Sequence, residues 1–181
     1  MLSAPLSAAA RSEALHALAE TEVDVLVVGG GVVGAGAALD AVTRGLSTGI
    51  VEARDWASGT SSRSSKLIHG GLRYLEMLDF GLVREALHER GLLLSTLAPH
   101  LVRPVPFLYP LTHHAWERPY VGAGIALYDA MATTYGSSRA LPMHRHLSRR
   151  RALRQAPCLR KESLTGAVQY WDAQVDDARH T

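Results

Sequence analysis

The sequence predicts an α/β fold built around a parallel β-sheet, and three observations near the N-terminus support this prediction. Residues 23–28 read V-D-V-L-V-V, an apolar run typical of a strand buried on both faces of such a sheet. Three glycines follow with the spacing G-x-G-x-x-G: Gly29, Gly31 and Gly34. A second apolar strand over residues 47–51 ends at Glu52, about 20 positions after the second glycine. Together with a helix over residues 35–43, these features predict a βαβ unit.

The glycine spacing has a physical meaning in such a unit. The first glycine allows a sharp turn, the second lets the backbone approach a pyrophosphate, and the third lets the helix pack closely on the strand. The phosphates then lie at the positive N-terminal end of the helix. A carboxylate at position 52 is placed to accept hydrogen bonds from a ribose, which disfavours a 2′-phosphate and therefore NADP. The unit predicts a dinucleotide ligand and leaves FAD and NAD both open.

Composition narrows the class of protein. The chain has 181 residues, 47% of them hydrophobic, and a net charge of +2, and it carries no nucleic-acid-binding motif, so we expect no nucleic-acid partner. Cys158 is the only cysteine, which excludes an internal disulfide. No window approaches the roughly 18 to 20 continuous apolar residues needed to cross a bilayer. Residues 1–20 lack the apolar core of a signal peptide and are predicted to be an N-terminal extension or a short helix.

Helical and strand patterns continue along the chain. Asp79 is placed to cap a helix that runs to about Leu97, with Arg90 among the charged residues off its apolar side. Prolines within residues 101–111 indicate an irregular or edge strand. A second helix is predicted over residues 117–133, with an apolar side made of Ile125, Leu127, Tyr128 and Met131.

The last quarter of the chain contains a basic helix and a strand. Ser148 is predicted to cap a helix that ends before Pro157, and residues 165–175 alternate as a strand does. Asp176 and Asp177 read as the acidic start of another helix rather than as a pair of catalytic acids. The chain ends before the further strands that a doubly wound sheet needs. We therefore expect it to be the N-terminal portion of a longer protein.

A segment rich in hydroxyl residues, 58–65, runs directly into K-L-I-H-G-G-L-R-Y-L over residues 66–75. Hydroxyls and free backbone amides donate hydrogen bonds without adding charge, so this segment is suited to a pyrophosphate or to the polar edge of a flavin. Gly70 and Gly71 would let the backbone pass against a flat ring. The alternative is a serine-rich surface turn before a helix.

Four motifs together resemble the N-terminal part of the FAD-dependent glycerol-3-phosphate dehydrogenases: G-G-G-V-V-G-A-G, T-S-S-R-S-S-K-L-I-H-G-G-L-R-Y-L-E, L-A-P-H and V-D-D-A-R. The resemblance implies a glutathione-reductase-like, FAD-binding Rossmann fold, incomplete here, with the start of a substrate-binding domain. We assign residues 1–20 to an extension, 21–110 to the FAD-binding region, and 111–181 to a helical insertion and the first strand and helix of the substrate domain.

The resemblance also implies roles for individual residues. Gly29, Gly31 and Gly34 would meet the FAD pyrophosphate and Glu52 the adenosine ribose. The flavin side would be lined by Thr60, Ser61, Ser62, Ser65, Lys66, Leu67 and His69. Arg73 and Tyr74 would approach the substrate, where a guanidinium suits anionic oxygens. His69 is a candidate catalytic base, with flavin orientation or satisfaction of backbone groups as the alternatives.

The implied reaction is oxidation of glycerol 3-phosphate to dihydroxyacetone phosphate, with electrons passing to a quinone. Further catalytic groups of the family would lie beyond Thr181, so we expect no activity from this chain alone. The alternatives are an amine or amino-acid oxidase of the same fold and a truncated, non-catalytic nucleotide-binding remnant.

The resemblance implies a cytoplasmic location with peripheral contact to the inner face of the cell membrane. Whether the protein forms a homodimer is left open. The basic stretch 145–161 is suited either to binding an anionic lipid surface or to forming a helix exposed to solvent. Two histidine pairs occur, at residues 113–114 and at residues 144 and 146. No carboxylate or cysteine cluster lies at a spacing that would complete a metal site with either pair, so no metal is expected.

Overall fold

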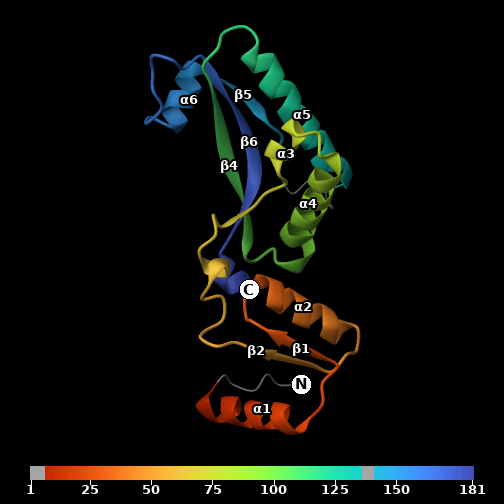
Figure 1. The fold of residues 1–181 in the computed structure, drawn as a ribbon. Coiled ribbons are helices and arrows are strands. Elements are labelled where there is room, and N and C mark those ends of the chain that lie inside the picture. Colours follow the sequence, from red (N-terminus) through yellow and green to blue (C-terminus); the bar gives the residue numbers. More distant parts are fainter. Residues whose placement is uncertain (1–6, 136–140) are drawn as a thin grey trace. The chain divides into compact units, whose positions relative to one another are not determined.

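The computed structural model describes residues 7–135 and 141–181, and it divides into two compact units (Figure 1). One unit comprises Met1–Ser64 with Asp177–Thr181, and the other comprises Ser65–Asp176. The boundaries assigned from sequence, after residues 20 and 110, fall inside these units. Residues 1–6 of the predicted extension and residues 136–140 lie outside the described part of the chain.

The first unit is the predicted βαβ arrangement. Strands β1 (Val25–Val28) and β2 (Thr48–Val51) pair in parallel, and helix α2 (Val32–Thr43) connects them. Helix α2 begins three residues earlier than predicted because Gly31 already serves as its N-cap. Helix α1 (Ala8–Glu20) forms within the N-terminal extension, and the Ser7 side chain caps it by accepting the backbone N–H of Ala10.

Strand β1 is not buried on both faces, which corrects the expectation from its apolar run. Leu26 is 55% exposed and Val28 is 81% exposed. Val27, between them, points toward α2, where its Cγ1 lies 3.3 Å from the position of a Cβ on Gly34. In the described residues this sheet has two strands, and Leu18 of α1 packs beside Leu26 on this face but leaves Leu26 and Val28 largely exposed.

Two short elements complete the first unit: the 3₁₀ turn η1 (Thr60–Ser62) and helix α7 (Asp177–His180). Asp177 is buried and accepts hydrogen bonds from the Ser64 hydroxyl at 2.8 Å and from the Ala178 N–H at 3.1 Å. The prediction that Asp177 lies at the start of a helix is therefore confirmed.

The second unit is built on an antiparallel sheet. Its central strand β6 (Gly166–Val175) pairs along its whole length with β4 (Val102–Leu111), and on its other edge with β3 (Leu67–Ile68) and β5 (Arg145–Ser148). The proline-rich β4 is an edge strand, as predicted, because an edge position tolerates residues without an N–H.

Helices cover both faces of this sheet. Figure 1 shows α3 (Leu72–Glu76), α4 (Phe80–Leu92) and α5 (Glu117–Tyr135) gathered on one side. Val168 packs in the core with Ile125 of α5, whereas the neighbouring Ala167 packs with Ala152 of α6 (Arg149–Gln155). Because successive strand residues point to opposite faces, α6 lies across the sheet from α5.

The helix predictions in this unit hold with two corrections. Asp79 caps α4 through the N–H of Leu82, and Ser148 caps α6 through the N–H of Arg151. The predicted first helix continues beyond α4 as a π-helical turn, η2 (Leu93–Leu97). Leu127 of α5, assigned to the apolar side, is 45% exposed, and Arg90 of α4, assigned to the polar side, is 3% exposed. Arg90 is buried because it has a buried acidic partner, described below.

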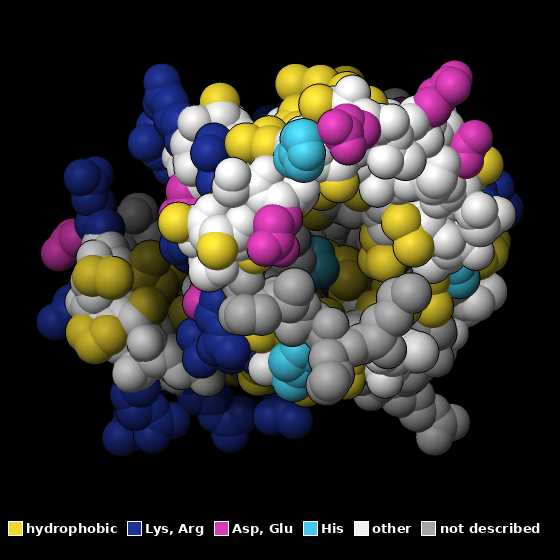
Figure 2. Space-filling view, turned by 90° about the horizontal axis from the view of Figure 1, so that it is seen from below, with side chains coloured by type: hydrophobic (Ala, Val, Ile, Leu, Met, Phe, Trp, Pro, Cys, Tyr) yellow, Lys and Arg dark blue, Asp and Glu magenta, His cyan; other side chains and the backbone are white. Residues whose placement is uncertain are grey.

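No helix in the described residues is long and apolar enough to cross a membrane. Hydrophobic side chains nonetheless reach the surface, and Figure 2 shows them (yellow) among basic side chains (dark blue) on the face that it presents.

Candidate cofactor and substrate site

The glycine turn after β1 has the geometry that its sequence predicts. Gly29 has a φ of +113°, a conformation that side chains with a Cβ rarely adopt. A Cβ on Gly34 would overlap the Gly29 carbonyl, so this glycine is what allows α2 to pack against the turn. Gly31 is the N-cap of α2 and provides no side-chain cap. The N-terminal end of a 12-residue helix therefore faces the turn with its positive dipole end.

Glu52 is tied to the same turn by its carboxylate. One oxygen accepts the Gly30 N–H at 2.7 Å and the other accepts the Arg54 N–H at 2.8 Å. These hydrogen bonds, that of Gly30 first, hold the pKa of Glu52 below its usual value. An ionised carboxylate has about four acceptor positions, so two hydrogen bonds leave capacity for ribose hydroxyls.

Ser61 reaches the glycine turn from a distant part of the sequence. Its hydroxyl accepts the Val32 N–H at 2.8 Å, and a Cβ on Gly31 would lie 3.0 Å from the same oxygen. Thr60 and Ser62 flank Ser61 in η1, and the Ser62 hydroxyl donates to the Gly59 carbonyl at 3.4 Å. The structure thus brings Ser61 and the glycine turn together, while Thr60 and Ser62 form the surrounding turn.

Sequence reasoning missed two residues that shape this turn. The ring of Trp56 lies against Gly30, leaving no room for a Cβ there. The N–H of Ala57, buried and at a φ of +58°, donates to the Gly30 carbonyl at 2.9 Å. Neither residue has a recognisable spacing, and only the fold brings them to the turn.

The first unit satisfies the requirements of a dinucleotide. It combines a glycine turn at a helix N-terminus, a hydroxyl at the same point and an ionised carboxylate at the end of the next strand. These groups would hold a pyrophosphate and a ribose, which are the polar parts of the adenosine diphosphate half of FAD.

In the second unit, Ser65, Lys66 and Leu67 lead into β3. Lys66 has a φ of +59°, and its carbonyl accepts the Val175 N–H at 2.9 Å, which anchors the start of β3 to the end of β6. His69 is exposed, and its Nδ1 accepts the Gly71 N–H at 3.2 Å. That hydrogen bond fits the alternative in which His69 satisfies a backbone group.

Gly70 and Gly71 form a tight turn that starts α3. Gly71 has a φ of +73° and is the N-cap of α3. A Cβ on Gly70 would overlap the side chains of Leu87 and Tyr128, so this glycine is required by packing in the protein interior. Helix α3 then presents Arg73, whose guanidinium lies 5.8 Å from the centre of the Tyr74 ring.

A buried polar cluster lies behind this turn and was not predicted from sequence. The Arg90 guanidinium pairs with the Asp172 carboxylate, and it donates to the Tyr128 hydroxyl at 2.9 Å. All three residues are at most 3% exposed. The only sequence signal was an acid within the predicted strand, residues 166–175, which by itself indicates no partner.

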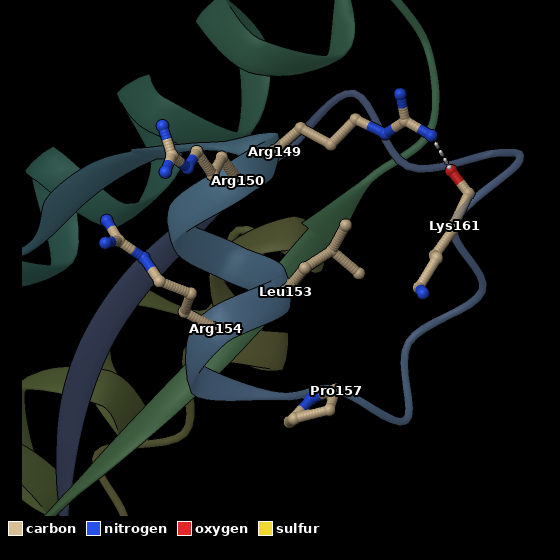
Figure 3. A pocket seen from close by; sticks show the side chains of 6 residues that line it. All are labelled: Arg149, Arg150, Leu153, Arg154, Pro157 and Lys161. Atoms are coloured by element: carbon tan, nitrogen blue, oxygen red, sulfur yellow. Dashed lines mark hydrogen bonds between the residues drawn. The ribbon is translucent and has the colours of Figure 1, made fainter.

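A basic surface forms around α6, defined by Arg149, Arg150, Arg154 and Lys161 (Figure 3). Arg149 donates to the Lys161 carbonyl at 2.7 Å, whereas Arg150 and Arg154 extend from the other side of the helix. Among the residues that the structure describes, no ion pair involves these four cations. Over the same residues, no three His, Cys, Asp or Glu side chains gather as a metal site would require.

Comparison with known proteins defines the class. The family model for FAD dependent oxidoreductases matches residues 24–181, and the chain belongs to this family. The predicted fold class and cofactor are therefore confirmed.

The resemblance to glycerol-3-phosphate dehydrogenases is also confirmed. The chain is 60% identical over 178 residues to glycerol-3-phosphate dehydrogenase 2 of Mycobacterium tuberculosis, covering 98% of this chain and 30% of that protein. It is 51% identical over 166 residues to the mitochondrial glycerol-3-phosphate dehydrogenase of Homo sapiens, covering 88% of this chain and 22% of that one. The chain thus spans less than a third of the length of these relatives.

A solved structure agrees with the sequence comparisons. The glycerol-3-phosphate dehydrogenase of Bacillus halodurans, complexed with FAD, superposes with a TM-score of 0.60 at 33% identity, over 94% of this chain and 25% of that one.

Proposed function

We propose that this chain supplies the nucleotide-binding part and one substrate-contacting segment of an enzyme that oxidises glycerol 3-phosphate to dihydroxyacetone phosphate. The observation that carries the proposal is the 60% identity to a glycerol-3-phosphate dehydrogenase across nearly the whole chain. The family match alone would equally admit other FAD-dependent substrates.

In the first unit, the glycine turn and the N-terminus of α2 hold the FAD pyrophosphate, Ser61 adds a hydroxyl beside it, and Glu52 accepts from the adenosine ribose. The fixed backbone supports this role, because the Glu52–Gly30 and Ser61–Val32 hydrogen bonds hold the turn and the start of α2 in place. Thr60 and Ser62 serve as turn residues that keep Ser61 in place.

In the second unit, Arg73 and Tyr74 bind the substrate, with the guanidinium of Arg73 paired to its phosphate or hydroxyl oxygens. The roles of Ser65, Lys66, Leu67 and His69 toward the flavin rest on the resemblance. Bound FAD would accept the hydride from C2 of the substrate. The proton of the C2 hydroxyl must go to a base, and His69 is the candidate in this chain because its ring is exposed.

The test is anaerobic reduction of the protein expressed from the full reading frame that contains this chain. Glycerol 3-phosphate should bleach the flavin absorbance and yield dihydroxyacetone phosphate, while glycine, proline and other amino acids should not. Bleaching by an amino acid but not by glycerol 3-phosphate would favour the oxidase alternative. A protein that binds FAD and is bleached by neither would favour the non-catalytic remnant.

The electron acceptor is proposed to be a membrane quinone, reached by peripheral contact of the protein with the membrane. The α6 basic surface supports that contact. Its cations point to different sides of the helix and flank a shallow hollow of about 470 Å³, so they do not converge on one small anion. A distributed set of cations suits the many phosphates of an anionic lipid surface, at about 1 kcal/mol per cation near the membrane.

Vesicle sedimentation tests this contact. The full-length protein should bind vesicles containing phosphatidylglycerol, bind pure phosphatidylcholine weakly, and dissociate as salt is raised. Replacing Arg150, Arg154 and Lys161 by Gln should abolish binding to the anionic vesicles. The control replaces three exposed arginines elsewhere, Arg11, Arg84 and Arg103. Equal loss of binding in both variants would indicate a response to net charge and would contradict a specific surface.

A further inference from the structure

Two elements of the second unit supply acceptors for one backbone N–H, and a third element contacts both acceptors. The Gly70 N–H donates to the Tyr128 hydroxyl of α5 at 2.7 Å and lies 3.3 Å from an Asp172 oxygen of β6. Arg90 of α4 contacts both acceptors, pairing with Asp172 and donating to the Tyr128 oxygen. Tyr128 in turn lies 3.2 Å from the second Asp172 oxygen, to which its hydroxyl donates.

The ion pair of this cluster has lost almost all of its hydration, because the side chains of Arg90 and Asp172 are only 4% and 5% exposed. A buried ion pair is weak evidence for stability, because desolvation of both charges opposes their attraction. Burial raises the pKa of Asp172, and the Arg90 guanidinium opposes that rise. The pKa of Tyr128 is raised, first by burial and then by the Asp172 charge, so its hydroxyl stays protonated and keeps donating.

The hydrogen bonds of the cluster end at a turn that is directly joined to candidate substrate residues. Gly70 precedes Gly71, the N-cap of α3, and Arg73 and Tyr74 lie in the first turn of that helix. Leu75 of α3 packs in one core cluster with Leu87 and Tyr128, and the half-buried Tyr74 packs against the same cluster. The turn and the short helix are therefore fixed from two directions, by a polar contact at Gly70 and an apolar contact at Leu75.

We propose that Arg90, Tyr128 and Asp172 are positioning residues that fix the Gly70–Gly71 turn and thereby set where Arg73 and Tyr74 meet the substrate. The substrate part of this inference rests on the proposed function. The cluster does not touch the substrate. It acts through the backbone of Gly70, and a buried polar network gives a fixed geometry that apolar packing alone specifies less precisely.

Tyr128→Phe is the sharpest variant, because it removes the nearer of the two acceptors of the Gly70 N–H while keeping the ring in the core. In the full-length enzyme it should raise KM for glycerol 3-phosphate roughly 5- to 10-fold, the size expected for one lost hydrogen bond, with kcat changed less than about twofold and FAD content unchanged. Two controls isolate the cause. Tyr120→Phe removes the hydroxyl of a 61% exposed tyrosine on the same helix, and Val83→Ala loosens the same core cluster without touching the turn.

Hydrogen exchange provides a readout that does not depend on the substrate. The Gly70 amide should be protected in the wild-type protein and in Val83→Ala, and should exchange faster in Tyr128→Phe. A KM in Tyr128→Phe equal to that of Val83→Ala, with equal Gly70 protection, overturns the positioning role. A wild-type enzyme that does not turn over glycerol 3-phosphate overturns the proposed function, and the exchange rates then decide by themselves whether the cluster fixes the turn.

Discussion

The carboxylate of Glu52 accepts the backbone N–H of Gly30 at 2.7 Å, so the acid at the end of β2 holds the glycine turn at the end of β1. The sequence pattern predicts this acid as a ribose ligand only. Its second role is structural, since the same side chain also accepts the Arg54 N–H. Glu52 thus links the two strand ends that must be fixed for a nucleotide to bind.

Glu52→Gln is expected to weaken FAD binding roughly 10- to 100-fold, because a charge-assisted acceptor becomes a neutral one at the ribose and at Gly30. Apoprotein from the full reading frame, titrated with FAD by flavin fluorescence, gives the affinity. Glu22→Gln, an exposed acid of the same unit, is the matched control and should leave affinity unchanged. An unchanged affinity in Glu52→Gln would show that the carboxylate serves the turn alone.

The lowered pKa of Glu52 predicts a pH dependence. The folded-state pKa lies below that of the unfolded chain, so the contribution of Glu52 to stability is present above the unfolded value of about 4.3 and is lost as pH falls through the folded-state pKa. The melting temperature of the wild type should exceed that of Glu52→Gln at pH 6, and the difference should shrink toward pH 3. If the difference in melting temperature stays constant between pH 6 and pH 3, the stabilisation by Glu52 comes from the shape of its side chain and not from its charge.

Local patterns predicted the elements well because each pattern reflects a local cause. The glycine turn, the caps at Asp79 and Ser148, and the edge strand with its prolines all follow from backbone requirements within a few residues. The family resemblance supplied the ligand, which the βαβ unit alone left open between FAD and NAD.

The wrong predictions of burial have a different cause, because burial depends on how segments that are distant in the sequence pack together. Arg90 was assigned to a polar helix face, yet it is buried because Asp172, 82 positions later, supplies its partner. The exposure of Val28 depends on which layers cover β1, and no periodicity in residues 23–28 contains that information. Buried ion pairs of this kind are visible only once the fold has placed both residues.

Gly70→Ala tests the packing role of that glycine. The added Cβ would overlap Leu87 and Tyr128, and overpacking of this kind costs about 1 to 3 kcal/mol. Gly124→Ala is the control, because nothing lies within 4 Å of a Cβ there and alanine in the interior of α5 should stabilise by about 0.5 to 1 kcal/mol. Chemical denaturation of the full-length protein measures both. A Gly70→Ala variant as stable as wild type would indicate that the turn rearranges freely.

Arg73→Lys separates substrate binding from structure at the start of α3. Lysine keeps one positive charge but loses the planar fork that pairs with two oxygens, so kcat/KM for glycerol 3-phosphate should fall by about tenfold or more while FAD content stays near that of wild type. The competing role is structural, since the guanidinium lies 5.8 Å from the centre of the Tyr74 ring. In that case the substitution should lower the melting temperature and leave kcat/KM per folded enzyme intact. Measuring FAD occupancy, melting temperature and kcat/KM on one preparation distinguishes the two, and a normal kcat/KM would remove Arg73 from the substrate site.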